Sequence, residues 1–207
     1  GDGGIITCND EKLATLIRKI GGLGFKSLTA ESGKVRTDRD KLQNPDWDRF
    51  DEIGYNYRLG QMAAAVALAQ MERAEYFIDL RRAMGLAYTE VLVNSELLTP
   101  QRVLDGYYHT YYTFSAKFNG EKLGVTWEEF RKKYIELGGD GIYAASKLQH
   151  QEPVFRDRNI GYGETPVAVD LQKNLMNFTT NQANEEDRNI QIEVMRRTQQ
   201  YFGDTLS

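Results

Sequence analysis

Hydrophobic side chains recur at helical spacing through a long middle segment of the chain. From about Leu59 to Leu92 they return every three or four positions, the period of an α-helix with one buried face. The segment is longer than an ordinary globular helix, so we expect a bend or break near Ala74. This is the strongest secondary-structure pattern in the chain.

Other segments carry start and stop signals for helices. Asn9 precedes an amphipathic stretch that glycines end after Ile20. A capping box begins at Thr126, and Asn184 precedes an acidic first turn that suits the helix dipole. The predicted helices span about 9–20, 126–137, 167–176 and 184–201.

Strand patterns are short. Gly1–Cys8 predicts a glycine-rich turn followed by an apolar strand, and Tyr111–Phe118 is rich in aromatic residues. Two more strands are expected at 142–145 and 177–180, after a loop through Pro153. The polar stretch 26–50, with a turn at 44–46, predicts a long surface loop. Together these elements indicate an α/β to α+β fold with one large domain or two small ones.

Composition narrows the class of protein. Of 207 residues, 41% are hydrophobic and 27% charged, which indicates a packed core. The net charge of −4 lacks the basic excess that nucleic acid selects, so we expect no nucleic-acid partner. The apolar run Met62–Ala69 is too short for a membrane span, and the N-terminus shows no export signal. Cys8 is the only cysteine, which excludes an internal disulfide and favours a cytoplasmic location.

The segment Gly54–Gly60 is the first candidate for chemistry. It places the amide of Asn56, the phenol of Tyr57 and the guanidinium of Arg58 at the entrance of the long helix. Free N–H groups and the helix dipole favour an anion there, and Arg58 can bind phosphate through a bidentate fork. The alternative is that Asn56 only caps the helix and Arg58 pairs with an acid at 51 or 52.

The two histidines have different expected roles. His150 lies in a polar loop and is the better candidate for ligand contact or proton handling. His109 lies in the aromatic run 107–114, which predicts a half-buried strand more than a stacking platform, and is expected to be a hydrogen-bonded packing residue. The opening Gly1–Gly4 lacks the Lys and Ser/Thr of a phosphate loop and predicts a turn.

Taken together, these motifs resemble one family. Gly1–Thr7 with the following Asn-Asp, the block Gly54–Leu59 with its alanine-rich helix, and His150 three residues before Pro153 are similar to the DegT/DnrJ/StrS family of pyridoxal 5'-phosphate (PLP)-dependent nucleotide-sugar aminotransferases. The agreement in order and spacing covers nearly the whole chain, and the block around Asn56 is its most specific part.

The resemblance implies an aspartate-aminotransferase fold (fold type I) and a division of the chain. Residues 1–58 would be the tail of the large PLP-binding domain, 59–93 a long connecting helix, and 94–207 the small C-terminal α/β domain. Members of the family pass an amino group from an amino acid, commonly glutamate, through the cofactor to a keto sugar on a nucleoside diphosphate.

The resemblance also implies roles for individual residues. Asn56 matches the residue that reaches the cofactor phosphate of the neighbouring subunit in a homodimer. Arg58 matches a residue near the phosphates of the nucleotide sugar, and His150 matches one at the substrate end of the cleft. Tyr57 is expected to bind substrate beside them.

The match has one departure with consequences for activity. In the family the Schiff-base lysine precedes the turn that matches Gly1–Gly4, and none of the lysines from Lys12 to Lys173 has a matching context. We therefore expect the C-terminal part of such an enzyme, with no catalytic residue and no transamination by this chain alone. Two alternatives stay open, a PLP-dependent sugar dehydratase of the same family and a non-catalytic dimerisation domain. Glu152, where the family more often has a neutral residue, also leaves the charge near His150 open.

Overall fold

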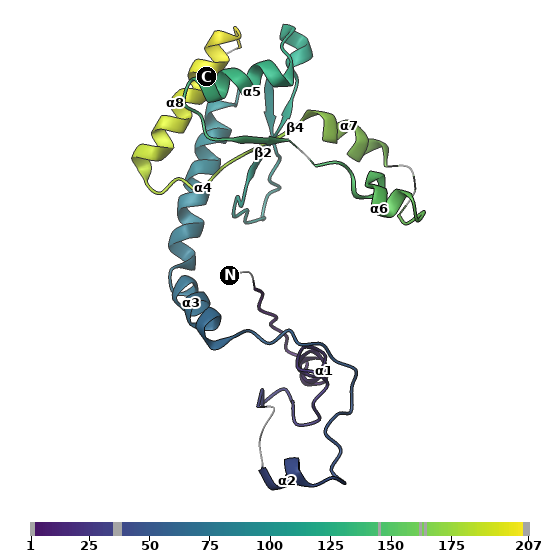
Figure 1. Ribbon diagram of the computed structural model, residues 1–207. Helices are drawn as coiled ribbons and strands as arrows, with labels where there is room; N and C mark the ends of the chain where they lie inside the picture. Colours follow the sequence, from purple (N-terminus) through teal and green to yellow (C-terminus); the bar gives the residue numbers. More distant parts are fainter. Residues whose placement is uncertain (1–2, 35–38, 145, 162, 164, 205–207) are drawn as a thin grey trace. The chain divides into compact units, whose positions relative to one another are not determined.

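The chain forms two compact units in the computed structural model, Gly1–Glu72 and Arg73–Ser207 (Figure 1). The structure describes residues 3–34, 39–144, 146–161, 163 and 165–204. The boundary between the units falls inside the predicted connecting helix 59–93, and the three-part division of the chain stays a prediction.

The described residues of the first unit form three helices joined by irregular segments: α1 (Glu11–Gly21), α2 (Arg39–Gln43) and α3 (Gln61–Met71). The cap of α1 is Asp10, whose carboxylate accepts a hydrogen bond from Leu13 N at 2.8 Å, so the predicted cap at Asn9 is wrong by one residue. A capping oxygen must reach the amide three residues ahead, and Asp10 has that spacing. The predicted surface loop 26–50 holds α2 and is otherwise irregular where described.

The predicted strand before Cys8 is wrong for the described residues 3–8. Ile5 and Ile6 are 70% and 71% exposed, and this stretch forms neither a helix nor a paired strand. A strand needs a neighbour that accepts and donates its backbone hydrogen bonds, and local apolarity alone does not supply one.

The second unit is a four-stranded antiparallel sheet covered by helices on one face. The strand order is β1 (Leu98–Pro100), β2 (Phe114–Phe118), β4 (Leu175–Phe178) and β3 (Ile142–Ala144). Three helices cover it, α4 (Ala74–Val91), α5 (Trp127–Glu136) and α8 (Glu185–Tyr201) (Figure 1). Smaller elements lie in the connections: η1 (Gly120–Leu123), η2 (Gln149–Gln151), α6 (Pro153–Arg156) and α7 (Pro166–Asn174).

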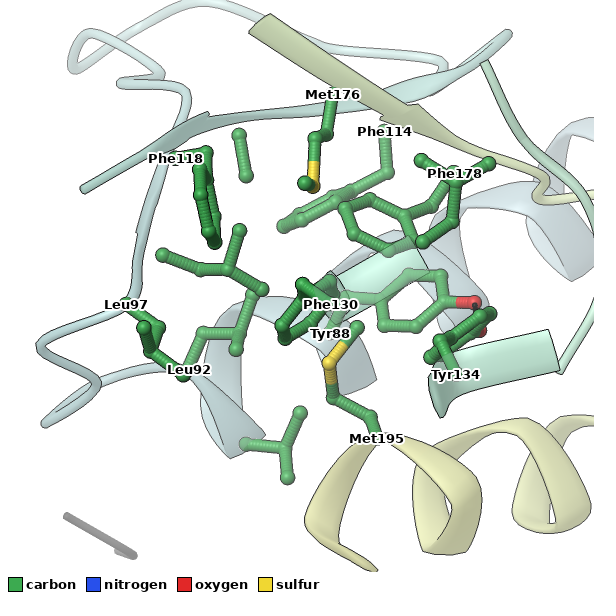
Figure 2. Close-up of a cluster of buried hydrophobic side chains, with 14 of the residues drawn as sticks. Tyr88, Leu92, Leu97, Phe114, Phe118, Phe130, Tyr134, Met176, Phe178 and Met195 are labelled. Carbon is green, nitrogen blue, oxygen red and sulfur yellow. Dashed lines mark hydrogen bonds between the residues drawn. The ribbon is translucent and has the colours of Figure 1, made fainter. Parts of the chain in front are cut away.

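The core of this unit lies between the sheet and the three helices. Side chains of β2 alternate between buried and half-buried, which is the period of a strand with one covered face. Figure 2 shows aromatic and methionine side chains from the strands pointing toward side chains from the helices. The labelled core residues are Tyr88, Leu92, Leu97, Phe114, Phe118, Phe130, Tyr134, Met176, Phe178 and Met195.

Most predicted elements of the second unit are confirmed, with shifted ends. The long helix is interrupted between Met71 and Ala74, and the capping box at Thr126 and the Asn184 cap are both present. The strand predicted at 111–118 begins only at 114, and that predicted at 177–180 begins at 175. Residue 145 and residues 1 and 2 lie outside the described residues. Strand β1 was not predicted, and the loop through Pro153 contains η2 and begins α6.

Tyr111 explains the late start of β2. Its φ of 49° lies in the left-handed region, which ends an extended strand. Hydrogen bonds hold it there: its N–H donates to His109 Nδ1 at 2.8 Å, and its carbonyl accepts from Thr180 Oγ1 at 2.6 Å. Long-range bonds therefore override the local strand preference of the aromatic residues.

Asp204 links the segment after α8 to the turn before β1 through hydrogen bonds. Its buried carboxylate accepts hydrogen bonds from Ser95 Oγ at 2.5 Å, Glu96 N at 2.6 Å and Gln199 Nε2 at 3.2 Å. Replacing Asp204 with asparagine should lower the free energy of unfolding by about 2 kcal/mol, because bonds to a buried charged acceptor are lost. Urea denaturation measures this, with Asp170→Asn in an exposed pair with Lys117 as control. Equal loss in both variants would contradict the role of Asp204.

Two buried phenols predict how stability responds to alkaline pH. A hydrogen bond of 3.2 Å joins the hydroxyl oxygens of Tyr88 and Tyr134, and burial raises the pKa of both phenols. Because the pKa of each phenol is higher in the folded than in the unfolded state, the contribution of the two phenols to the free energy of unfolding is complete below about pH 10. As pH rises further it is lost, by about 1.4 kcal/mol per pH unit for each phenol. Tyr134→Phe should make the alkaline fall of the unfolding free energy shallower. Tyr112→Phe, at a ring 78% exposed, should leave the slope unchanged.

Candidate functional site

The candidate site lies in the first unit, in the segment before α3. Arg58 Nε donates a hydrogen bond to Asn56 Oδ1 at 2.9 Å, and both side chains are exposed. This bond engages Nε of the guanidinium and leaves its two Nη groups and Asn56 Nδ2 available as donors. Among the described residues, no other hydrogen bond involves these side-chain donors. The pair therefore presents fixed N–H donors to solvent.

Two backbone segments, residues 20–24 and 51–57, pair side by side and position Asn56 and Arg58; we call them the ribbon. The segment after Phe50 runs antiparallel to the end of α1, with Leu23 N donating to Tyr55 O at 2.9 Å and Tyr57 N donating to Gly21 O at 2.8 Å. Gly22 and Asn56 form an isolated bridge between these strands. Asn56 is thus held by the end of α1, more than thirty residues earlier in the chain.

Two glycines allow the ribbon to close. A Cβ on Gly24, whose φ is +76°, would lie 1.9 Å from Glu52 O, and a Cβ on Gly54 would lie 2.2 Å from Gly24 N. Both obstacles are backbone atoms, which cannot move aside like a flexible side chain. The close approach of the two segments therefore requires glycine at both positions.

The start of α3 adds further donors near the pair. Its N-cap is Gly60, which offers no side-chain acceptor for the first-turn N–H groups. Such groups, with the positive end of the helix dipole, favour an anion. Tyr57 is 73% exposed and stacks on Tyr55 with ring centroids 5.4 Å apart. The segment thus joins N–H donors with an accessible aromatic face.

The alternative roles of Asn56 and Arg58 are wrong. Asn56 is not the cap of α3, because Gly60 holds that position. Asp51 pairs with Lys19 at 2.6 Å, and Arg58 bonds to Asn56 in its place. Glu52 Oε1 accepts from the neighbouring Ile53 N at 3.1 Å. The guanidinium therefore has no carboxylate partner among the described residues.

His150 lies in the second unit, in η2, and is half-buried. A Cβ on Gly161 would lie 4.0 Å from His150 Cβ, so the turn at Gly161 packs beside this histidine. The structure thus brings Asn56, Tyr57 and Arg58 together in one unit and places His150 in the other. The substrate role of His150 stays a prediction.

His109 is confirmed as a hydrogen-bonded packing residue. Its Nε2 lies 2.7 Å from Gln101 Nε2, and its ring contacts Tyr111 with centroids 4.3 Å apart. Arg82 donates to the His109 carbonyl at 2.6 Å and lies 3.8 Å from the Tyr108 ring centroid. The aromatic run before β2 is therefore a loop held by these hydrogen bonds and ring contacts, and not the half-buried strand that the alternation predicts.

One polar cluster has no counterpart in the sequence interpretation. Gln182 Nε2 donates to Asp140 Oδ2 at 2.8 Å and to Thr179 Oγ1 at 3.2 Å. These residues come from distant segments and follow no periodic pattern.

No group of three or more His, Cys, Asp or Glu side chains within the described ranges could hold a metal ion. Nor is any helix in that part of the chain both long and apolar enough to cross a bilayer.

Comparisons with known proteins give a consistent picture. The model of the DegT/DnrJ/EryC1/StrS aminotransferase family matches residues 1–194. The GDP-perosamine synthase of Caulobacter vibrioides is 29% identical over 140 residues, which are 67% of this chain and 33% of that protein.

Two solved structures have the same fold. The aminotransferase from Psychrobacter cryohalolentis has a TM-score of 0.77 at 15% identity, over 95% of this chain and 51% of that one. Helicobacter pylori PseC, an aminotransferase involved in the biosynthesis of pseudoaminic acid, has a TM-score of 0.69 at 15% identity, over 93% and 47%. The predicted α/β to α+β fold of type I aminotransferases is confirmed, and the chain spans about a third to a half of the length of these relatives.

Proposed function

Because the chain belongs to the DegT/DnrJ/EryC1/StrS aminotransferase family, we propose that it serves the PLP-dependent transfer of an amino group to a sugar. The amino donor is an amino acid, commonly glutamate, and the acceptor is a keto sugar on a nucleoside diphosphate. The similarity to a GDP-perosamine synthase and to an aminotransferase of pseudoaminic acid biosynthesis supports this substrate class.

The Asn56–Arg58 pair carries the proposal. A phosphate group needs several converging N–H donors, and the two Nη groups of Arg58 form a fork that matches two phosphate oxygens. The bond from Arg58 Nε to Asn56 Oδ1 orients both side chains before a ligand arrives. In this proposal Asn56 holds the phosphate of PLP and Arg58 the phosphates of the nucleotide sugar, with Tyr57 and His150 binding the substrate.

The N–H donors of Asn56 and Arg58 suit a phosphate group such as that of PLP, and the bound cofactor would supply the electron sink and carry the amino group. The 207 residues contribute donors that hold and orient phosphates, and we assign no catalytic residue to them. Lys19 is ion-paired with Asp51, and Glu136 beside Lys133 raises the pKa of that lysine. A lysine that forms a Schiff base needs a lowered pKa.

Exposed apolar surface in the first unit supports a homodimer. Helix α3 is apolar on nearly every side, with Met62 86%, Val66 63% and Leu68 64% exposed. Contiguous surface of this kind is rare on soluble monomers and marks association sites. We propose that it is covered in the assembled enzyme, where 1–58 belong to the large domain, 59–93 connect, and 94–207 form the small domain. A cytoplasmic location agrees with nucleotide-sugar substrates.

Binding of pyridoxamine phosphate tests the proposal on this chain directly. Fluorescence titration should show saturable binding of pyridoxamine phosphate and at least tenfold weaker binding of pyridoxamine, because the phosphate makes the contacts. Asn56→Ala should weaken the phosphate-bearing ligand and leave pyridoxamine unchanged. Equal affinities for pyridoxamine phosphate and pyridoxamine would contradict the proposed phosphate-binding role of this site.

A further inference from the structure

The carboxyl end of α1 faces the segment of the ribbon that carries Asn56. The carbonyl of Ile20, in the last turn of the helix, accepts a hydrogen bond from Tyr55 N at 2.6 Å. The carbonyl of Gly21, the final residue of the helix, accepts one from Tyr57 N at 2.8 Å. This end of a helix is the negative end of its dipole. The helix therefore places negative potential beside the side chains that we propose to bind phosphate.

A carboxylate of the ribbon adds to this negative potential. Asp51 belongs to the second segment of the ribbon, where its backbone N–H donates to Gly24 O at 3.2 Å. A phosphate that approaches Asn56 and Arg58 is repelled both by this carboxylate and by the end of α1. A further cation that offsets these two charges would therefore strengthen the binding of an anion at Arg58.

Lys19 supplies that cation. It lies in the last turn of α1, and its Nζ is 2.6 Å from Asp51 Oδ2. The two side chains are 18% and 36% exposed, which makes this the most shielded ion pair among those of the described residues. Lys26 and Asp48 in the same unit form a far more exposed pair, 3.9 Å apart with side chains 49% and 83% exposed. Salt screens a shielded charge less than an exposed one, so the ammonium of Lys19 acts on the ribbon at full strength.

We propose that Lys19 determines the preference of the Asn56–Arg58 site for anions: its ammonium group neutralises Asp51 and the end of α1 without touching the ligand. This inference rests on the proposed function and gives the ion pair an electrostatic role. A link that only held the ribbon together would be broken by loss of either partner. In the electrostatic role the two partners have opposite effects, because loss of the Asp51 charge removes repulsion and leaves the ammonium in place.

Isothermal titration of the chain with pyrophosphate at low salt tests this role. Lys19→Met should weaken pyrophosphate about fivefold, and Asp51→Asn, which keeps an oxygen that can accept from Lys19, should bind it about twofold more tightly than the parent chain. The double variant should lie between the two single variants. Both effects should shrink as salt is added, because salt screens the charges.

Lys26→Met is the matched control, since it removes the cation of an exposed Lys–Asp pair in the same unit. It should change the affinity for pyrophosphate less than Lys19→Met does. Equal weakening in both variants, or unchanged affinity in Lys19→Met, overturns the proposal. If hydrogen exchange at the Leu23 amide shows that Lys19→Met opens the ribbon, Asp51→Asn decides. Tighter binding by Asp51→Asn supports the role of Lys19, and equal or weaker binding overturns it.

Arg58→Ala separates this inference from the proposed function. Loss of pyrophosphate binding in Arg58→Ala, with no response to Lys19→Met or Asp51→Asn, supports the phosphate site and overturns only the role of Lys19. A parent chain that does not bind pyrophosphate contradicts both.

Discussion

Replacing Arg58 with alanine is expected to weaken the binding of pyrophosphate to this chain about 30-fold, or about 2 kcal/mol, because a bidentate charge-assisted contact is lost. Pyrophosphate is the probe because it carries the part that all nucleoside diphosphates share. Isothermal titration at low salt measures the change. Arg58→Lys keeps the positive charge but loses the planar pair of N–H donors. Its affinity for pyrophosphate should therefore lie between that of the parent chain and that of Arg58→Ala.

The control for Arg58→Ala removes the same charge elsewhere. Arg156 lies in the second unit, in an exposed pair with Asp157 at 3.0 Å, so Arg156→Ala should bind pyrophosphate like the parent chain. If both variants weaken pyrophosphate equally, binding reflects net charge alone. The role assigned to Arg58 would then be wrong.

Replacing Gly54 with alanine is expected to lower the free energy of unfolding of the first unit by about 3 kcal/mol, through overpacking. The added Cβ would lie 2.2 Å from Gly24 N and 2.7 Å from both Leu23 C and Lys19 O, all backbone atoms. The ribbon that positions Asn56 would separate, so pyridoxamine phosphate binding should be lost as well. Hydrogen exchange at Leu23 and Tyr57 amides measures the opening of the ribbon.

Gly33→Ala is the matched control in the same unit. A Cβ on Gly33 would meet nothing within 4 Å, and the substitution should leave both exchange and binding unchanged. Retained protection at Leu23 in Gly54→Ala would show that the two segments are not as close as the structure has them.

Local signals explain which parts of the fold could be predicted from the sequence. The capping box at Thr126 and the cap at Asn184 depend on residues three positions apart, and both are present. Strand β1 has three residues and exists through pairing with β2, so no periodic pattern marks it. Tyr111 has a strand-forming side chain, but distant hydrogen bonds give it a left-handed backbone.

The candidate site shows the same limit. Residue types and order predicted an anion site at Asn56 and Arg58, and the structure adds their mutual hydrogen bond. What holds Asn56 in place is the end of α1, a pairing that local periodicity does not reveal. Asp140 and Gln182 are 42 residues apart in loops, so local sequence patterns do not reveal the hydrogen bond that joins them.

The central claim is that Asn56 and Arg58 bind phosphate groups. The most direct measurement follows the Arg58 Nε–H and Asn56 side-chain amide signals by ¹H–¹⁵N NMR while pyridoxamine phosphate is added, with pyridoxamine in a parallel titration. The account predicts saturable shifts of the Asn56 amide signals, and of the Arg58 Nε–H signal through its hydrogen bond to Asn56, with pyridoxamine phosphate and none with pyridoxamine. Saturable binding that leaves these two signals in place, or that moves them equally with both ligands, would contradict it.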